Sequence, residues 1–293
     1  MTEDAMAVIQ PGLGLSVQDR RRIGWRKFGV PPSGPMDTHA STWANRLLDN
    51  PPDAPLLELV LQGARLLVLQ DVWVAVTGAD ASSTIPAWRV VRVRKGEEIR
   101  FPESRSGVWI YLAVEGGFAV PTPLGCASTY ARAGLGSIGH AGSRWRRRVA
   151  MPFSLPDGVA SRSVPALERR DYARPPELRV WPGPQRPAFP EADAAAFFER
   201  TWTISSRSDR LGYRLNGDPL AGVPPHNLSE PVRVGTVQVP AGGLPIVTMW
   251  DGPTVGGYPK LGLIHPEDLT WLAQCRPGQA VRFRPLDETG SEL

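Results

Sequence analysis

The sequence predicts a mainly β protein, because many turn residues separate short apolar runs. The 293 residues include 31 prolines and 30 glycines, which is typical of chains with many tight turns. In several of the apolar runs, apolar and polar residues alternate with the period of a half-buried strand. Strands are expected at residues 56–69, 72–77, 88–93, 108–114, 178–181, 236–239, 244–250 and 280–283.

A few short helices are expected among these strands. Apolar residues at positions 40, 43, 44, 47 and 48 recur with helical spacing, and Asp37 precedes them as a possible N-cap. Residues 191–200 and 266–274 suit shorter helices, and Pro266 fits the first turn of the second of these.

The chain is expected to form two domains joined by a linker. Between residues 151 and 176, Pro, Ser, Asp and Arg replace the periodic apolar residues. We therefore expect one domain at residues 1–150 and another at residues 177–293, a division that suits a chain of 293 residues. The pattern Gly-x-x-[Ile/Val]-Arg-Phe recurs at residues 96–101 and 278–283, which hints at two similar halves.

Composition and charge exclude several classes of protein. No apolar run reaches the roughly 18 residues of a membrane helix, and the acidic start is unlike a secretory signal, so we expect a cytoplasmic protein. The net charge of +4 is spread along the chain apart from a cluster at residues 144–148, so no nucleic acid partner is expected. Two cysteines are too few for a disulfide framework, and neither they nor the four histidines have zinc-ligand spacing, so no metal is expected.

Common nucleotide-binding motifs do not fit this sequence. Residues 134–139 match GxGxxG, but the flanking residues suit neither the preceding strand nor the following helix that a dinucleotide fold requires. A P-loop sequence is absent.

Two shorter segments are candidates for parts of a binding site. Residues 29–37 form a Gly- and Pro-rich loop that presents Ser33 and ends at Asp37; the alternative is a capped helix entry. Residues 208–215 place Asp209, Arg210 and Arg214 around a glycine. Arg210 is either aimed at an anionic ligand or held in a structural ion pair.

The strongest candidate is the loop at residues 251–260, which follows an apolar run. Its adjacent glycines, Gly256 and Gly257, let backbone N–H groups approach a ligand, and Thr254, Tyr258 and Lys260 add hydrogen-bond donors. The chain has only three lysines among 33 basic residues, which favours a functional ammonium at this position. Such a loop suits a carboxylate, a carbonyl oxygen or a phosphate, and a plain hairpin turn is the alternative.

These segments belong to an ordered series of motifs that resembles a known family. The matching segments are residues 17–19 (Val-Gln-Asp), 29–30, 33–34, 36–37, 44–45, 57–58, 77–79 (Thr-Gly-Ala), 111–117 (Tyr-Leu-Ala-Val-Glu-Gly-Gly), 128–130, 132–134, 183–185 (Gly-Pro-Gln), 208–215, 238–240, 254 with 256–260 (Gly-Gly-Tyr-Pro-Lys) and 276–278. In this order they resemble the biotin-dependent carboxyltransferase family, also called the KipA or allophanate hydrolase subunit 2 family, which includes the C subunit of 5-oxoprolinase.

The resemblance implies two tandem cyclophilin-like β-barrel domains. It also implies the C subunit of a 5-oxoprolinase, which acts only with a KipI-like B subunit and a separate A subunit and uses ATP to hydrolyse 5-oxo-L-proline to L-glutamate. Whether ATP binds on this chain or on a partner stays open. Any biotin would arrive on another protein, because the Met-Lys-Met attachment sequence is absent.

Two alternatives follow from the same resemblance. One is the carboxyltransferase component of a biotin-dependent system of the urea carboxylase or allophanate hydrolase type. The other is a KipA-like regulatory protein that binds a KipI-like kinase inhibitor.

For an enzyme, we expect Lys260, Tyr258 and Asp251 to be catalytic. The expected substrate-binding residues are Thr254, Gly256, Gly257, Arg210, Ser33 and Asp37. Two departures from the family pattern affect these loops. Arg21 stands where relatives commonly have glycine, and Gly252-Pro253 replaces an Arg-Gln pair, which removes hydrogen-bond donors.

Overall fold

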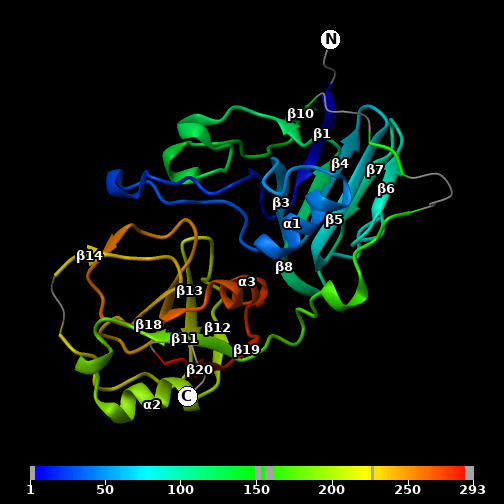
Figure 1. Cartoon of the computed structure of the whole chain (residues 1–293). Coiled ribbons are helices and arrows are strands. Elements are labelled where there is room, and N and C mark those ends of the chain that lie inside the picture. Colours follow the sequence, from blue (N-terminus) through cyan, green and yellow to red (C-terminus); the bar gives the residue numbers. More distant parts are fainter. Residues whose placement is uncertain (1–3, 149–152, 156–160, 226–227, 288–293) are drawn as a thin grey trace. The chain divides into compact units, whose positions relative to one another are not determined.

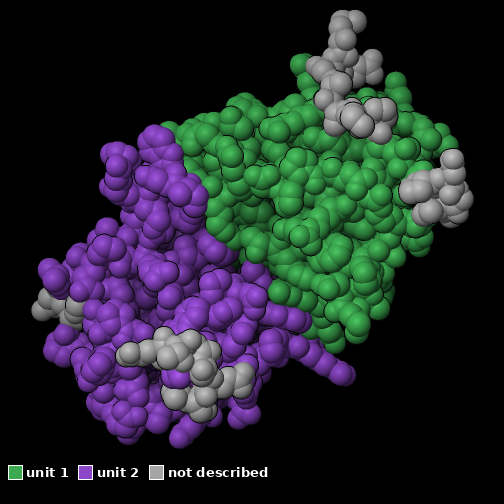
Figure 2. Space-filling view, in the orientation of Figure 1, with its two compact units in different colours: residues 1–22, 33–172 green, residues 23–32, 173–293 purple. Residues whose placement is uncertain are grey.

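The computed structural model of the chain describes residues 4–148, 153–155, 161–225 and 228–287. Two compact units are present, as the colours of Figure 2 show. Unit 1 comprises residues 1–22 and 33–172, and unit 2 comprises residues 23–32 and 173–293. The short segment 23–32 therefore belongs to unit 2, although unit 1 flanks it in the sequence.

The expected linker at residues 151–176 is only partly described. Residues 151, 152 and 156–160 lie outside the described residues. Residues 161–172 belong to unit 1, where Ser163 forms a β-bridge with Arg89 and the Tyr172 hydroxyl donates a 2.7 Å hydrogen bond to Asp37. Unit 2 resumes at Ala173.

Unit 1 holds two antiparallel five-stranded sheets (Figure 1). The first has the order β7-β4-β1-β10-β9, with β1 (Asp4–Pro11), β4 (Ala64–Val68), β7 (Glu98–Phe101), β9 (Phe118–Ala119) and β10 (Arg144–Arg147). The second has the order β2-β3-β8-β5-β6, with β2 (Leu15–Gln18), β3 (Leu56–Val60), β5 (Val72–Asp80), β6 (Val90–Val93) and β8 (Ser106–Val114).

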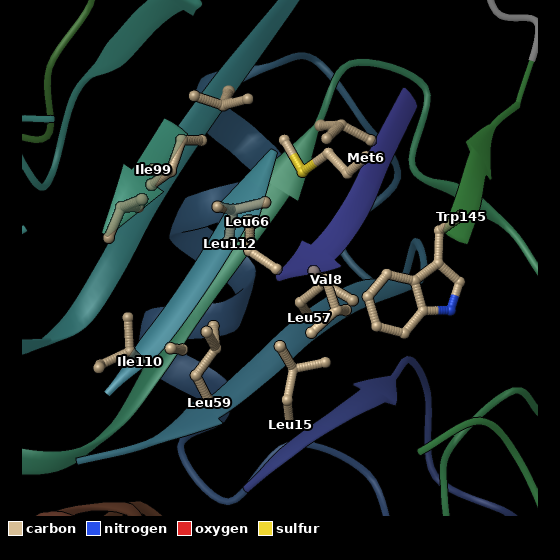
Figure 3. Packing of buried hydrophobic residues seen from close by; sticks show 14 of the residues in the cluster. Met6, Val8, Leu15, Leu57, Leu59, Leu66, Ile99, Ile110, Leu112 and Trp145 are labelled. Carbon is tan, nitrogen blue, oxygen red and sulfur yellow. The ribbon is translucent and has the colours of Figure 1, made fainter. Parts of the chain in front are cut away.

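Alternate residues of the two sheets build one apolar core in unit 1. Val8 of β1, Leu66 of β4, Leu59 of β3 and Leu112 of β8 are buried in this cluster, and Trp145 packs beside them (Figure 3). Because side chains alternate between the two faces of a strand, the intervening residues point away from the core. Burial of these apolar side chains supplies the main driving force for the fold of the unit.

The helix α1 (Thr38–Leu47) packs on the second sheet of unit 1, against β5 and β8. Asp37 is its N-cap, and the Asp37 carboxylate accepts from the backbone N–H of Ala40 at 3.1 Å. The Thr77 hydroxyl of β5 donates to the Ala40 carbonyl at 2.7 Å and ties the helix to the sheet. The predicted helix and its N-cap are both confirmed.

Unit 2 is built on an eight-stranded sheet of order β19-β12-β13-β16-β15-β18-β11-β20. Its strands are β11 (Leu178–Pro182), β12 (Trp202–Ile204), β13 (Gly212–Asn216), β15 (Thr236–Gln238), β16 (Ile246–Thr248), β18 (Lys260–Ile264), β19 (Ala280–Val281) and β20 (Phe283–Pro285). β11 and β20 pair in parallel, and the other neighbouring strands pair antiparallel. A separate ribbon joins β14 (Glu230–Pro231) to β17 (Val255–Gly256).

Unit 2 also contains the helices α2 (Glu191–Glu199) and α3 (Pro266–Gln274), with Pro266 in the first turn of α3. Both helices were predicted within one residue of these bounds. The short 3-10 helices of the described chain are η1 (Arg26–Phe28), η2 (Pro123–Gly125), η3 (Ala131–Ala133), η4 (Ala166–Glu168) and η5 (Arg186–Ala188). The mainly β class with a few short helices is confirmed.

One expected strand is wrong in its extent. Residues 56–69 form two strands, β3 and β4, which lie in different sheets. The chain turns between them because Leu61 and Gly63 adopt left-handed backbone conformations, with φ of 52° and 87°. Because leucine rarely takes this conformation, the apolar run did not indicate a turn.

Candidate functional site

A cavity of about 800 Å³ in unit 2 contains the lysine singled out from the sequence. The cavity forms where the end of β11 and the following η5 lie against β18 and the segment after β14. It is lined by Trp181, Pro182, Gly183, Pro184, Arg186, Pro187, Pro231, Arg233, Thr236, Lys260, Gly262 and Leu263. Its size is within the range of pockets that take small molecules.

Lys260 is held in the wall of this cavity by a charged network. Its side chain is 5% exposed, and its ammonium contacts the Glu230 carboxylate at 2.8 Å. Gln185 donates to the same carboxylate oxygen at 2.9 Å, while the Gln185 side-chain oxygen accepts from the Lys260 backbone N–H at 3.1 Å. The three side chains therefore fix one another, so the position of the ammonium is well determined before a ligand binds.

The backbone around Lys260 explains why these residues meet. A register shift between β15 and β18 pairs Val237 with Gly262 but Gln238 with Lys260, which is the pattern of a β-bulge. Bulges redirect side chains and often lie next to binding sites. Gly183 lies against this bulge, because a Cβ at this position would come within 2.3 Å of the Lys260 carbonyl oxygen. The motif Gly-Pro-Gln at residues 183–185 thus combines a close backbone approach with the anchoring glutamine.

The Gly-Gly turn belongs to the ribbon that carries Glu230. Gly256 lies in β17 opposite Glu230 of β14, so the turn positions the carboxylate that contacts Lys260. Neither Gly256 nor Gly257 has a positive φ. A Cβ on Gly256 would come within 3.0 Å of the Val232 side chain and 3.1 Å of the Gln238 side chain, so these neighbours would have to shift to accept a larger residue.

Tyr258 and Thr254 lie near this ribbon but do not line the cavity. Tyr258 is 50% exposed, and the Thr254 carbonyl accepts from the backbone N–H of Val232. Of the expected residues in the loop at 251–260, the cavity walls include Lys260.

Asp251 and Arg210 contact each other. The Arg210 guanidinium forms two hydrogen bonds to the Asp251 carboxylate, at 2.7 and 3.1 Å, and the Asp251 backbone N–H donates to the Arg210 carbonyl. Neither residue lines the cavity around Lys260. This geometry matches the structural ion pair that the sequence left open as an alternative.

Ser33 and Asp37 belong to unit 1 and are not among the lining residues of the cavity in unit 2. The buried Asp37 carboxylate caps α1 and accepts from the Tyr172 hydroxyl, while its backbone N–H donates to the Tyr111 hydroxyl at 2.7 Å. Burial and the nearby carboxylate of Glu58 raise the pKa of Tyr111 well above its ordinary value. Ser33 has a left-handed backbone, and no hydrogen-bond partner of its buried hydroxyl is found among the described residues.

Three basic side chains, those of Arg186, Arg233 and Lys260, line the cavity. Lys260 is paired with Glu230, and Arg186 contacts Glu191 at 2.8 Å. Arg233 is exposed on the wall and forms no ion pair within the described part of the chain. Such a wall attracts anionic ligands. Sequence reasoning did not find Glu230, Arg186 or Arg233, because only the folding of β14 and η5 brings them to Lys260.

The described residues contain neither a metal-binding cluster nor a helix that could cross a membrane. Within residues 4–148, 153–155, 161–225 and 228–287, no group of three or more His, Cys, Asp or Glu side chains is arranged to hold a metal ion. Among the same residues, no helix has the length and apolar character needed to cross a bilayer.

Comparison with known proteins places this architecture in a family. Residues 28–285 match the family described as carboxyltransferase domain, subdomain A and B. The chain is 33% identical over 285 residues to the C subunit of 5-oxoprolinase from Escherichia coli (strain K12), an alignment that covers 95% of this chain and 90% of that protein.

Solved structures show the same fold. The crystal structure of TTHA0988 superposes with a TM-score of 0.86 at 34% identity, over 96% of this chain and 56% of that chain. The urea amidolyase of K. lactis superposes with a TM-score of 0.85 at 27% identity, over 98% of this chain and 19% of that chain. This chain thus spans about half of the first protein and about a fifth of the second. The family match and the 33% identity to the 5-oxoprolinase subunit both extend over most of the chain. The chain therefore belongs to the family described as carboxyltransferase domain, subdomain A and B.

Proposed function

We propose that the chain is the C subunit of an ATP-dependent 5-oxoprolinase that hydrolyses 5-oxo-L-proline to L-glutamate. The observation that carries this proposal is the 33% identity to the C subunit of a 5-oxoprolinase, which extends over 90% of that protein. In this proposal the chain acts in a cytoplasmic complex with an A subunit and a KipI-like B subunit. Because that relative is itself one subunit of an enzyme, the identity supports a requirement for partner chains.

The chemistry of the cavity supports a small anionic amide as the ligand. 5-Oxoproline combines a carboxylate with a cyclic amide, and its ring opening is difficult because the amide carbon is a poor electrophile. Transfer of the ATP γ-phosphoryl group to the amide oxygen releases ADP and makes that carbon a better electrophile. Water then adds to the carbon, and the ring C–N bond breaks as the nitrogen takes a proton, which leaves an acyl phosphate on the opened chain. A second water hydrolyses this acyl phosphate to glutamate and phosphate.

Lys260 is the residue that we assign to the substrate. Its ammonium is desolvated in the cavity wall, where a fixed cation stabilises negative charge better than in water. Glu230 and Gln185 act as positioning residues, because they contact Lys260 and hold its side chain and backbone. A ligand oxygen that binds the Lys260 ammonium does so while the ammonium also contacts the Glu230 carboxylate.

The proposal is tested by co-expressing the chain with the genes adjacent to its own and assaying the purified mixture. We expect glutamate to form from 5-oxoproline, with one ADP for each turnover, only when ATP and the complete set of subunits are present. Omission of this chain is the matched control. A complete mixture that hydrolyses no 5-oxoproline in the presence of ATP would rule out the proposed reaction.

A second candidate is carboxyl transfer from carboxybiotin to urea or another small amide. The superposition on urea amidolyase with a TM-score of 0.85 favours this candidate. Biotin would be carried by another protein. An activity that requires a biotinylated partner, and that avidin blocks, would identify this reaction, whereas 5-oxoproline hydrolysis is expected to be insensitive to avidin.

A further inference from the structure

Two arginines of unit 2, Arg26 and Arg233, have no carboxylate partner among the residues that the structure describes, and Arg233 lines the cavity. Arg26 belongs to the segment 23–32, and its guanidinium donates to the carbonyl oxygen of Val232, the residue before Arg233. Partial burial and then the charge of Arg233 lower the pKa of Arg26 below its ordinary value. Because Arg26 contacts the residue next to Arg233, an anion that binds both side chains offsets the repulsion between their charges.

The other charges at the cavity are already balanced. Glu230 neutralises Lys260, and Glu191 neutralises Arg186. Within the residues that the structure describes, neither Arg26 nor Arg233 forms an ion pair. A single carboxylate would compensate only one of these two cations, whereas phosphate groups carry more charge and match the fork of a guanidinium.

The size and walls of the cavity point beyond a simple phosphate ion. A volume of about 800 Å³ suits a ligand much larger than one phosphate group. Trp181 forms part of the wall, where its indole packs with the His265 ring at 5.0 Å between centroids. Prolines of the lining add further apolar surface. An indole in this position offers a stacking surface for a nucleobase.

We propose that this cavity binds a nucleoside polyphosphate, with the phosphates at Arg26 and Arg233 and the base toward Trp181. The choice of a nucleoside triphosphate rests on the proposed function, because that reaction consumes ATP. The Lys260 side of the same cavity then holds the amide substrate, which places the two reactants in one cavity. The site does not use a P-loop, and it relies on side-chain cations instead of a glycine-rich backbone.

The test is isothermal titration calorimetry of the purified full-length chain with ATP, ADP, pyrophosphate and adenosine, each with and without Mg²⁺. We expect ATP to bind more tightly than pyrophosphate, and adenosine to bind weakest. Arg233→Gln is expected to weaken ATP and pyrophosphate binding about tenfold or more, because a charge-assisted hydrogen bond is lost. Trp181→Leu is expected to weaken ATP about tenfold and leave pyrophosphate unchanged.

Arg132→Gln is the matched control, since Arg132 is an exposed arginine of unit 1. This variant has the same net charge as Arg233→Gln and is expected to bind ATP within about twofold of the parent chain, an interval well below one tenfold step. Absence of ATP binding to the parent chain, or equal ATP binding by Arg233→Gln and Arg132→Gln, would overturn the proposal.

The titration also separates this inference from the proposed reaction. It uses neither partner chains nor 5-oxoproline, so ATP binding with no glutamate formation in the complete mixture contradicts only the proposed function. Glutamate formation by the mixture, with no ATP binding to this chain, contradicts only the nucleotide site. Pyrophosphate that binds as tightly as ATP shows a phosphate site without a base pocket and overturns the assignment of a nucleoside ligand.

Discussion

The first and last residues of the loop at residues 251–260, Asp251 and Lys260, are both charged but have different surroundings. Asp251 and Lys260 are both largely buried charged residues of one loop. Lys260 faces a cavity, whereas Asp251 is occupied by two hydrogen bonds from Arg210. We therefore assign Asp251 and Arg210 to stability and Lys260 to ligand binding.

A double-mutant cycle at Arg210 and Asp251 tests this assignment. The side chains are 17% and 9% exposed, so water screens their attraction little. We expect Arg210→Ala and Asp251→Ala to show a coupling free energy of about 1–3 kcal/mol in urea unfolding. The exposed pair Arg282 and Glu177, 3.9 Å apart, is the control, with an expected coupling below about 0.5 kcal/mol. Equal coupling in the two pairs would contradict the structural role of the buried pair.

The N-cap of α1 gives a second prediction at this scale. Asp37→Ala removes the acceptor for the backbone N–H of Ala40 and for the Tyr172 hydroxyl, and we expect a loss of about 1–2 kcal/mol or more in unfolding free energy. Asp37→Asn keeps an acceptor and should recover part of this loss. Asp53→Ala, at an exposed position, is the control. Unfolding curves for Asp37→Ala and Asp53→Ala that coincide would refute the role of Asp37 in capping.

At the scale of elements, the pair of strands β4 and β7 carries an acid-sensitive contact. Glu98 of β7 accepts hydrogen bonds from Arg65 of β4 and from Arg100, and the first of these contributes most to lowering the pKa of Glu98 to about 2. An unfolded glutamate titrates near pH 4.3. The stabilisation is therefore present above about pH 4.5 and is lost as the pH falls toward 2.

Glu98→Gln is expected to be less stable than the parent chain at pH 7, and the difference should shrink as the pH falls from about 4.5 toward 2. Chemical denaturation at a series of pH values measures this difference. Glu103→Gln, at an exposed position of the loop after β7, should show no such trend. A constant difference between Glu98→Gln and the parent chain over this pH range would contradict the predicted titration.

The elements also show what the sequence could predict about the fold. Periodic apolar residues and Asp37 were sufficient to predict α1, and Pro266 indicated where α3 begins. The run at residues 56–69 was misleading because its turn uses Leu61, whose left-handed backbone has no sequence signal. The strand pairs β1–β4 and β1–β10 join residues distant in sequence, so local patterns could not reveal them.

The candidate site was predictable only in part for the same reason. The scarcity of lysine and the Gly-Gly-Tyr-Pro-Lys sequence indicated Lys260, and the Gly-Pro-Gln motif included its partner Gln185. Glu230 lies 30 positions before Lys260 and reaches it only because β14 pairs with β17. Arg26 lies farther still, in a segment that joins unit 2 although unit 1 surrounds it in the sequence.

At the scale of the whole molecule, each compact unit contains one buried cysteine. Burial raises the pKa of Cys126 in unit 1 and raises that of Cys275 in unit 2 to about 12, and Asp19 adds to the effect at Cys126. Both thiols are therefore protonated at neutral pH and shielded from reagents. We expect neither to react with Ellman's reagent in the native protein and both to react in concentrated urea.

The single-thiol variants Cys126→Ser and Cys275→Ser extend this measurement to the separate units. In each variant the remaining thiol reports the unfolding of one unit as the urea concentration rises. The total thiol content in urea is the control, with two reactive groups in the parent chain. Rapid and complete labelling of either thiol in the native protein would contradict the burial described for that unit.

The proposed role of the chain in a 5-oxoprolinase depends most directly on the ammonium of Lys260. The decisive measurement is the rate of ATP-dependent glutamate formation from 5-oxoproline by the assembled complex, with Lys260→Met compared with Lys95→Met, which removes an exposed lysine of unit 1. We expect Lys260→Met to lower the rate about 100-fold or more, as for loss of a fixed charge-stabilising group, and Lys95→Met to leave it unchanged. Equal rates for the two variants would contradict the assignment of Lys260 to the substrate.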